Sequence, residues 1–139
     1  MIVIAHQMDL LMSVDGVGER VALKMIMETD AFTSFTDPRK FCCHAGVVPF
    51  VYVSGSSQRS KNRVSNRADK SIKHLLHMAA LSVSQVKNSP LKKYYDRKVE
   101  EGKNKMSVLN AVRAKLVTIM FAVIRADAFF SRNYQNSLA

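Results

Sequence analysis

The sequence predicts a mainly α fold, in which a helix-hairpin-helix is followed by a helical bundle, with a short extended segment near residues 47–53. Apolar residues recur at helical spacing through most of the chain, and one long irregular passage interrupts them at residues 46–60. With 139 residues, 47% of them hydrophobic, the chain is long enough for one well-buried domain and too short for two comfortable ones. We therefore expect residues 1–139 to form a single domain.

The start of the chain is expected to form two helices joined by a turn that contains two glycines. Residues 2–12 and 19–29 are apolar at helical spacing, and between them Gly16 and Gly18 follow the order apolar-x-Gly-apolar-Gly. Glycine adopts backbone angles that other residues disfavour. The backbone amides at the start of the following helix can then donate hydrogen bonds to phosphate oxygens, a contact that does not depend on the base sequence. The same residues also fit a plain αα-hairpin whose glycines serve only the turn, and the sequence leaves both interpretations open.

Local start and stop signals mark the remaining helices. Asp37 as N-cap and Pro38 in the first turn predict a short helix that ends before Gly46. Phe32 and Phe35, in the connector before it, are expected to pack back on the hairpin. Apolar spacing and a second Ser-Pro start predict further helices over residues 68–87, 90–101 and 105–129. The last of these carries the broadest apolar face, so it should be the central core element.

The irregular passage places Ser54 in a loop of small residues after the extended segment. Just beyond it, one acid, Asp69, lies among six basic residues: Arg59, Lys61, Arg63, Arg67, Lys70 and Lys73. A hydroxyl beside this much positive charge suits phosphate chemistry, with Ser54 as nucleophile and the basic residues as phosphate contacts. Ser-Gly pairs are also ordinary loop formers and basic runs often only solvate a surface, so a non-catalytic loop is the alternative.

The charge balance favours a polyanionic partner. Lys and Arg number 21 against 11 Asp and Glu, which gives a net charge of +10 and a pI near 9.9. Release of counterions therefore favours nucleic acid first and an anionic membrane surface second. No apolar run reaches the ~18 residues of a membrane span, and the first residues lack the pattern of a signal peptide. We expect a soluble, cytoplasmic protein that does not bind membranes.

The two cysteines, Cys42 and Cys43, are adjacent, so a framework of disulfides is impossible and a reducing compartment fits. Together with His44, His74 and His77 they raise the question of a metal site. The C-x-x-C spacing of structural zinc is missing, however. We expect buried cysteines, surface histidines and no metal bound by this chain.

Several blocks occur in a characteristic order: the Gly-x-Gly turn, F-x-x-x-A-G-x-x-P from Phe41 to Pro49, the Ser54-Gly55 step, a basic loop leading into a helix, Tyr94-Tyr95, Gly102-Lys103, Val112 and Lys115-Leu116. This order resembles the carboxy-terminal domain of insertion-sequence transposases of the IS110/IS116 family. The resemblance covers about residues 10–129, nearly the whole chain.

The resemblance implies that Ser54 is the serine nucleophile of a DNA recombinase and forms a covalent phosphoserine link to DNA. It also implies an amino-terminal, RuvC-like domain with four metal-binding acids. A divalent metal such as Mg²⁺ would belong to that domain, and no cofactor to this chain. The partners it implies are DNA, a structured guide RNA and further copies of the same protein, in the bacterial cytoplasm.

The RuvC-like half is absent from these residues, so we interpret the chain either as the carboxy-terminal part of a longer protein or as a truncated relic. In both cases we expect that it does not recombine DNA alone. Its expected parts are a helix-hairpin-helix (1–30), a short helix and serine-bearing basic loop (31–67), a helical core (68–130) and a tail (131–139). The alternative function is a non-catalytic helix-hairpin-helix module that binds nucleic acid.

Overall fold

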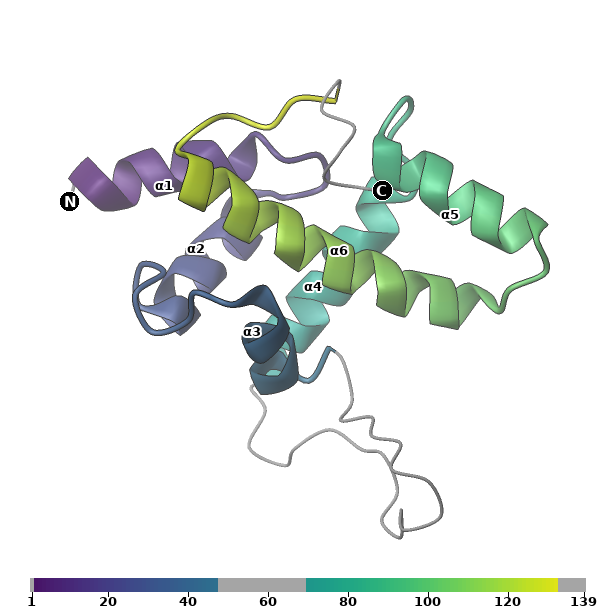
Figure 1. The fold of residues 1–139 in the computed structure, drawn as a ribbon, viewed down its shortest axis with the longest axis horizontal. Coiled ribbons are helices and arrows are strands. Elements are labelled where there is room, and N and C mark those ends of the chain that lie inside the picture. The colour runs from purple at the N-terminus through teal and green to yellow at the C-terminus, as the bar shows by residue number, and fades with distance from the viewer. Residues whose placement is uncertain (1, 48–69, 133–139) are drawn as a thin grey trace, which may run out of the picture.

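The fold is mainly α, as the sequence predicts. A computed structural model describes residues 2–47 and 70–132, and these ranges contain helices and no strand. The helices, in chain order, are α1 (Ile2–Met12), α2 (Glu19–Thr29), α3 (Pro38–Ala45), α4 (Lys70–Val83), α5 (Pro90–Glu100) and α6 (Lys105–Ala126). Figure 1 shows α6 crossing the middle of the molecule, and it contacts α1, α3, α4 and α5. One cluster of buried apolar side chains draws on all of these helices.

The first two helices pack together as an αα-hairpin, which both interpretations of the sequence include. Leu10 and Leu11 bury the end of α1, and α2 buries Val21, Ala22 and Met25 on one face. Residues 13–18 join them in a tight turn. The Val14 N–H donates to the Leu11 carbonyl at 3.1 Å, and the Val17 N–H donates to the Val14 carbonyl at 3.1 Å. The α1–α2 hairpin is therefore set by apolar periodicity and by this turn.

The short helix α3 has the caps that the sequence predicts. The Asp37 side chain accepts a hydrogen bond from the Arg39 N–H at 2.9 Å, and Pro38 occupies the first turn. Gly46 ends the helix in the left-handed region at φ 75°. Of the predicted extended segment at 47–53, only Val47 belongs to the described residues, where it forms a buried bend.

The aromatic residues before α3 make ring contacts with α6 and α3. Phe32 meets Phe121 of α6 edge to face, with ring centroids 5.0 Å apart, and Phe35 meets Phe41 of α3 in the same way at 5.4 Å. Phe121 and Phe41 are buried, so these edge-to-face contacts attach the connector to the core. Packing of the two rings on the α1–α2 hairpin stays a prediction.

Helix α4 ends at Val83, earlier than the predicted residue 87. The Ser84 hydroxyl donates to the Leu81 carbonyl at 2.8 Å, and the next amides make short-range bonds of the turn type. These local bonds compete with continuation of the helix. Asn88 then adopts φ 67°, and the Ser89 side chain caps α5 by accepting from the Leu91 N–H at 3.3 Å.

Helix α6 begins at a strong cap and forms the core. The Asn104 side chain accepts from the amides of Met106 (2.9 Å) and Ser107 (3.2 Å). Of the helices in the two described ranges, α6 alone is long and apolar enough to cross a membrane, but 56% of its apolar window is buried inside the domain. It is the central element of a packed core, as predicted from its broad apolar face.

The chain after α6 returns to the first turn. The helix ends at Ala126, and Asp127 takes φ 54°, so the predicted end at residue 129 is too late. The Phe130 N–H donates to the Ser13 hydroxyl at 2.9 Å, and the Arg132 guanidinium holds the Asp15 carboxylate at 2.9 and 3.0 Å. These long-range bonds lay residues 128–132 along the α1–α2 turn.

Candidate nucleic-acid interface

The turn between α1 and α2 needs glycine at position 16 for two reasons. Gly16 has φ 88°, which side chains strongly disfavour. A Cβ atom there would also lie 2.6 Å from the Val83 Cβ and 3.1 Å from the Ala79 carbonyl oxygen. The last turn of α4 therefore packs directly on the backbone of Gly16, and the glycine serves the packing of the hairpin on α4.

Gly18 has a different environment. It is the N-cap of α2 with extended backbone (φ −99°, ψ −175°), it is exposed, and a Cβ atom there would meet nothing within 4 Å. No side chain caps the helix. The first amides of a helix have no partner within it, so this end of α2 can accept an anion. Arg20 in the first turn favours an anion there, whereas Glu19 opposes it.

The remaining predicted site residues are only partly described. Lys73 is half-buried on α4, and Lys70 is the first residue of that helix. The candidate nucleophile and four of the predicted phosphate contacts lie outside the described residues: Ser54, Arg59, Lys61, Arg63 and Arg67. Gly16 packs at the far end of α4 from Lys73, roughly 15 Å along the helix axis at 1.5 Å per residue. The structure therefore does not bring Gly16 and Lys73 together at one point.

A groove between α2 and α4 combines basic and apolar side chains. Its volume is about 330 Å³, and its lining residues are Arg20, Leu23, Lys24, Met27, Ser71, His74 and Leu75. Leu23 and Met27 are 45% and 65% exposed, so apolar surface lies beside the cations of the groove. The predicted contact list did not include Arg20 or Lys24. Their spacing with Leu23 and Met27, at i, i+3, i+4 and i+7, places them on one helix face and could have indicated this stripe.

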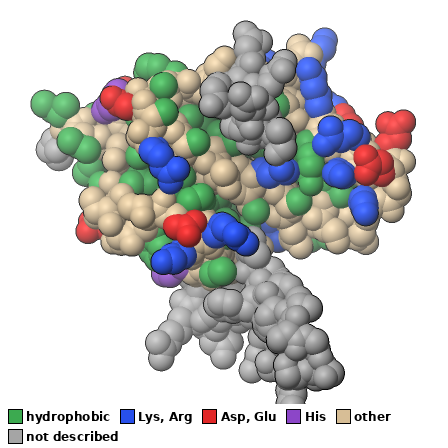
Figure 2. All heavy atoms as spheres, viewed as in Figure 1, with side chains coloured by type: hydrophobic (Ala, Val, Ile, Leu, Met, Phe, Trp, Pro, Cys, Tyr) green, Lys and Arg blue, Asp and Glu red, His purple; other side chains and the backbone are tan. Residues whose placement is uncertain are grey.

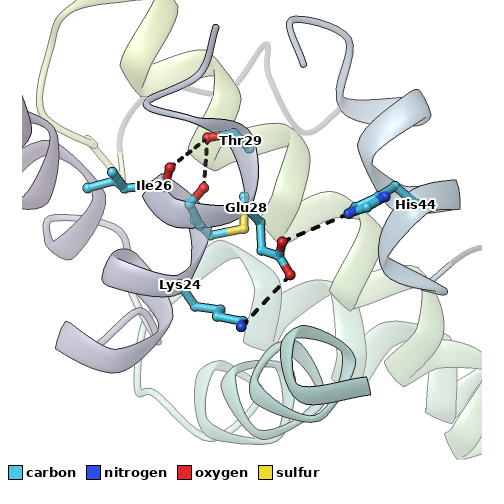
Figure 3. A network of polar contacts seen from close by, with 6 residues as sticks. Lys24, Ile26, Glu28, Thr29 and His44 are labelled. Carbon is cyan, nitrogen blue, oxygen red and sulfur yellow. Dashed lines mark hydrogen bonds and ion pairs between the residues drawn. The ribbon is translucent and has the colours of Figure 1, made fainter. Parts of the chain in front are cut away.

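A polar network joins α2 to α3 beside this groove (Figure 3). The Lys24 Nζ lies 3.9 Å from the Glu28 Oε1, and the His44 Nε2 lies 4.0 Å from the Glu28 Oε2. The neighbouring Thr29 is fully buried, and its hydroxyl donates to the Met25 carbonyl at 2.7 Å. The network fixes the imidazole of His44 next to a carboxylate near the end of α3. Residues 28 and 44 belong to different helices, so periodicity gives no sign of this pairing.

The cysteines differ in burial: Cys42 is buried, as predicted, whereas Cys43 is only half-buried, so the prediction is wrong for Cys43. Burial, and to a lesser degree the nearby Cys43 and Asp37, raise the pKa of the Cys42 thiol to about 12, so it stays protonated. Burial, together with Arg113 and His74, lowers the pKa of His77 below its ordinary value. Over residues 2–47 and 70–132, no three His, Cys, Asp or Glu residues gather closely enough to hold a metal ion.

The parts of the chain that the structure describes are helical, and they combine an open helix N-terminus at Gly18 with a groove that contains Arg20 and Lys24. Residues 8–96 match the family described as Transposase IS116/IS110/IS902 family. The match covers more than half of the chain, including the α1–α2 turn and the position of Ser54. The protein belongs to this family.

Relatives with similar sequences are named for DNA rearrangement or insertion elements. The chain is 27% identical over 127 residues to the pilin gene-inverting protein of Moraxella bovis, and 26% identical to its counterpart in Moraxella lacunata. It is also 27% identical over 129 residues to an uncharacterized 43.6 kDa protein of insertion element IS110 from Streptomyces coelicolor. These alignments cover 91% of this chain, 39% of each pilin gene-inverting protein and 31% of the IS110 protein.

Proposed function

We propose that this chain is the DNA-binding and serine-bearing domain of a transposase or recombinase that cuts and rejoins DNA. The observation that carries the proposal is the family match over residues 8–96, which spans the α1–α2 turn, the Ser54 position and the basic stretch that follows it. The names of the Moraxella relatives, which refer to inversion of a gene, support recombination as the reaction class.

Two kinds of contact with the DNA backbone follow from this proposal. The open N-terminus of α2 at Gly18 offers backbone amides, while Gly16 lets the turn pack tightly enough on α4 to hold that end in place. The basic residues Arg59, Lys61, Arg63, Arg67, Lys70 and Lys73 neutralise phosphates. Both kinds of contact position DNA without specifying its sequence.

Ser54 is the proposed nucleophile. Its hydroxyl oxygen attacks a DNA phosphodiester, a serine–phosphate bond forms, and the bond from phosphorus to one DNA strand breaks. The serine proton leaves with a general base, and the released strand end takes up a proton as its hydroxyl. Because the phosphoserine link keeps a phosphodiester, a second strand hydroxyl can reverse the step and rejoin DNA without an external energy source.

A divalent metal such as Mg²⁺ belongs, in this proposal, to a RuvC-like partner domain. In the parts of the chain that the structure describes, no cluster of acids fits such an ion, so no step is assigned to a metal held by these residues. A structured guide RNA and a homo-oligomer are the further proposed partners, in the cytoplasm of a bacterium. The excess of positive charge, +10 overall, is compatible with both DNA and RNA.

The second candidate function is a non-catalytic module that binds nucleic acid. It is favoured by the α2–α4 groove, whose two cations, Arg20 and Lys24, suit a phosphate backbone. Replacing Ser54 by Ala in a chain that also carries the acidic partner domain separates the candidates. The catalytic proposal predicts that strand exchange disappears while DNA binding persists, and exchange that survives the change would contradict it.

DNA binding itself is tested by salt dependence. If about six phosphates are neutralised, the logarithm of the association constant should fall against the logarithm of salt concentration with a slope on the order of −5. Fluorescence anisotropy with a labelled DNA duplex measures this slope. A flat salt dependence would show that the basic residues do not contact phosphates, and both candidate functions would fail.

A further inference from the structure

Helices α5 and α6 bring three cations to one aromatic ring. The Lys115 Nζ lies 4.8 Å from the centroid of the Tyr94 ring, the Arg97 Cζ lies 5.6 Å from it, and the Lys98 Nζ lies 5.9 Å from it. Tyr94 and Lys115 are half-buried, whereas Arg97 is exposed. We name these four residues the Tyr94 cluster. Lys115 comes from α6 and the others from α5, so packing of the two helices creates the cluster.

Two of the three cations have no acidic partner within residues 2–47 and 70–132. Lys98 lies 3.5 Å from the Glu101 carboxylate, and the nearby Asp96 is held by Lys92 at 2.5 Å. Among the described residues, no carboxylate lies within ion-pair distance of Arg97 or Lys115. Like charges this close to one another repel, and the ring quadrupole offsets only part of that repulsion. A bound anion would offset the rest.

The surroundings of the cluster are also basic. Between residues 92 and 105, six Lys or Arg residues stand against three Asp or Glu residues. Figure 2 shows Lys and Arg side chains gathered over the α5 end of the molecule, with a few acidic side chains among them. Lys93, Lys103 and Lys105 are exposed there. The local field therefore attracts a polyanion rather than a single small anion.

We propose that the Tyr94 cluster is a second binding surface for the phosphodiester backbone of a nucleic acid, with Arg97 and Lys115 as the phosphate contacts. The inference rests on the proposed function and extends it to α5 and α6, which carry none of the residues predicted from the sequence to bind nucleic acid. Arg97 and Lys115 also lie beyond residues 8–96, the range that matches the family.

Each residue of the Tyr94 cluster has a distinct role in the proposed contact. The planar guanidinium of Arg97 can hold two oxygens of one phosphate, and the ammonium of Lys115 adds a point charge from the neighbouring helix. The Tyr94 ring holds both cations in place before the polymer arrives, which reduces the side-chain entropy lost on binding. Tyr94 is thus a positioning residue.

The test compares salt slopes for charge-removing and charge-conserving variants. The double variant Arg97→Gln/Lys115→Gln removes two cations but keeps polar, unbranched side chains. Lys103→Gln/Lys105→Gln is the matched control, because it removes the same charge at the same end of the molecule outside the cluster. Arg97→Lys/Lys115→Arg keeps the charge and checks that substitution alone is harmless. Circular dichroism confirms that each variant retains its helices.

Binding is measured between about 50 and 200 mM salt with a short DNA duplex and, separately, with a single-stranded RNA of equal phosphate number. Loss of two contacts should make the slope shallower by about 1.8 for the duplex or about 1.4 for the single strand. The charge-conserving variant should keep the wild-type slope. The control, which weakens only the surrounding field, should change the slope clearly less than Arg97→Gln/Lys115→Gln does. A change seen with only one polymer identifies that polymer as the ligand of the cluster.

Two outcomes would overturn the inference while leaving the proposed function intact. One is a wild-type slope in Arg97→Gln/Lys115→Gln with both polymers. The other is an equal loss in Lys103→Gln/Lys105→Gln, which would mean that net charge matters and the cluster does not. If the wild-type chain binds neither polymer in a salt-dependent way, the proposed function is wrong and the inference fails with it.

Discussion

Replacement of Gly16 by Ala tests the packing of the α1–α2 turn on α4. Two penalties add at this position. An alanine at φ 88° pays roughly 1–2 kcal/mol for a left-handed conformation. Its Cβ would also lie 2.6 Å from the Val83 Cβ and close to the α4 backbone, and such overpacking typically costs about 1–3 kcal/mol. We expect Gly16→Ala to lower the free energy of unfolding by about 2–5 kcal/mol in total.

Gly102 provides a matched control. It has φ 94°, nearly the same as Gly16, but a Cβ atom there would meet nothing within 4 Å. Gly102→Ala should therefore show only the backbone penalty, about 1–2 kcal/mol. The difference between the two variants isolates the contact between the turn and α4.

Urea titration followed by circular dichroism measures both free energies of unfolding. The slope of free energy against urea concentration should stay close to that of the wild-type chain, because neither change alters the surface exposed on unfolding. If Gly16→Ala destabilises the protein no more than Gly102→Ala does, the close approach of α4 to the turn is not a constraint on the fold. The structural role assigned to Gly16 would then be wrong.

Three further predictions concern a helix cap, a histidine and the cysteines. Asn104→Ala removes the side chain that caps α6 and should lower the free energy of unfolding by about 0.5–2 kcal/mol; an unchanged urea midpoint would contradict this. His77 has a lowered pKa in the folded chain, so the unfolded chain binds a proton more readily and stability should fall as pH drops below about 6.5. His77→Gln should lessen that fall, and an identical pH dependence would refute it. Cys43 should react with iodoacetamide faster than Cys42, because burial raises the pKa of the Cys42 thiol to about 12. Peptide mass spectrometry measures the labelling of each cysteine, and faster labelling of Cys42 would contradict the prediction.

The elements predicted best are those with local signals. The caps of α3 and α5 lie in the residues that form them, so Asp37-Pro38 and Ser89-Pro90 were sufficient to place both helix starts. Helix ends were predicted less well. Helix α4 stops where the Ser84 hydroxyl bonds back to the preceding turn, and α6 stops where the chain leaves to reach Ser13, a contact over more than a hundred residues.

In the candidate interface, too, features with local sequence signals were predicted and features that depend on tertiary packing were not. The turn glycines were found because their spacing is local, but the reason for Gly16, contact with Val83 of α4, depends on tertiary packing. The Lys115 contact with Tyr94 joins two helices, and so does the Glu28–His44 pair. Periodicity places each side chain on a face of its own helix and carries no information about which face it meets. The prediction for Ser54 rests on the family resemblance and lies outside the described residues.

The most direct test of the central proposal is a search for a covalent bond between residue 54 and DNA. A protein that joins this domain to the proposed RuvC-like domain is incubated with a DNA substrate, denatured, digested and analysed by mass spectrometry. The proposal predicts a nucleotide phosphate on the peptide at Ser54, absent in Ser54→Ala and retained in the matched controls Ser56→Ala and Ser57→Ala. Strand exchange that continues in Ser54→Ala, or an adduct on a different residue, would contradict it.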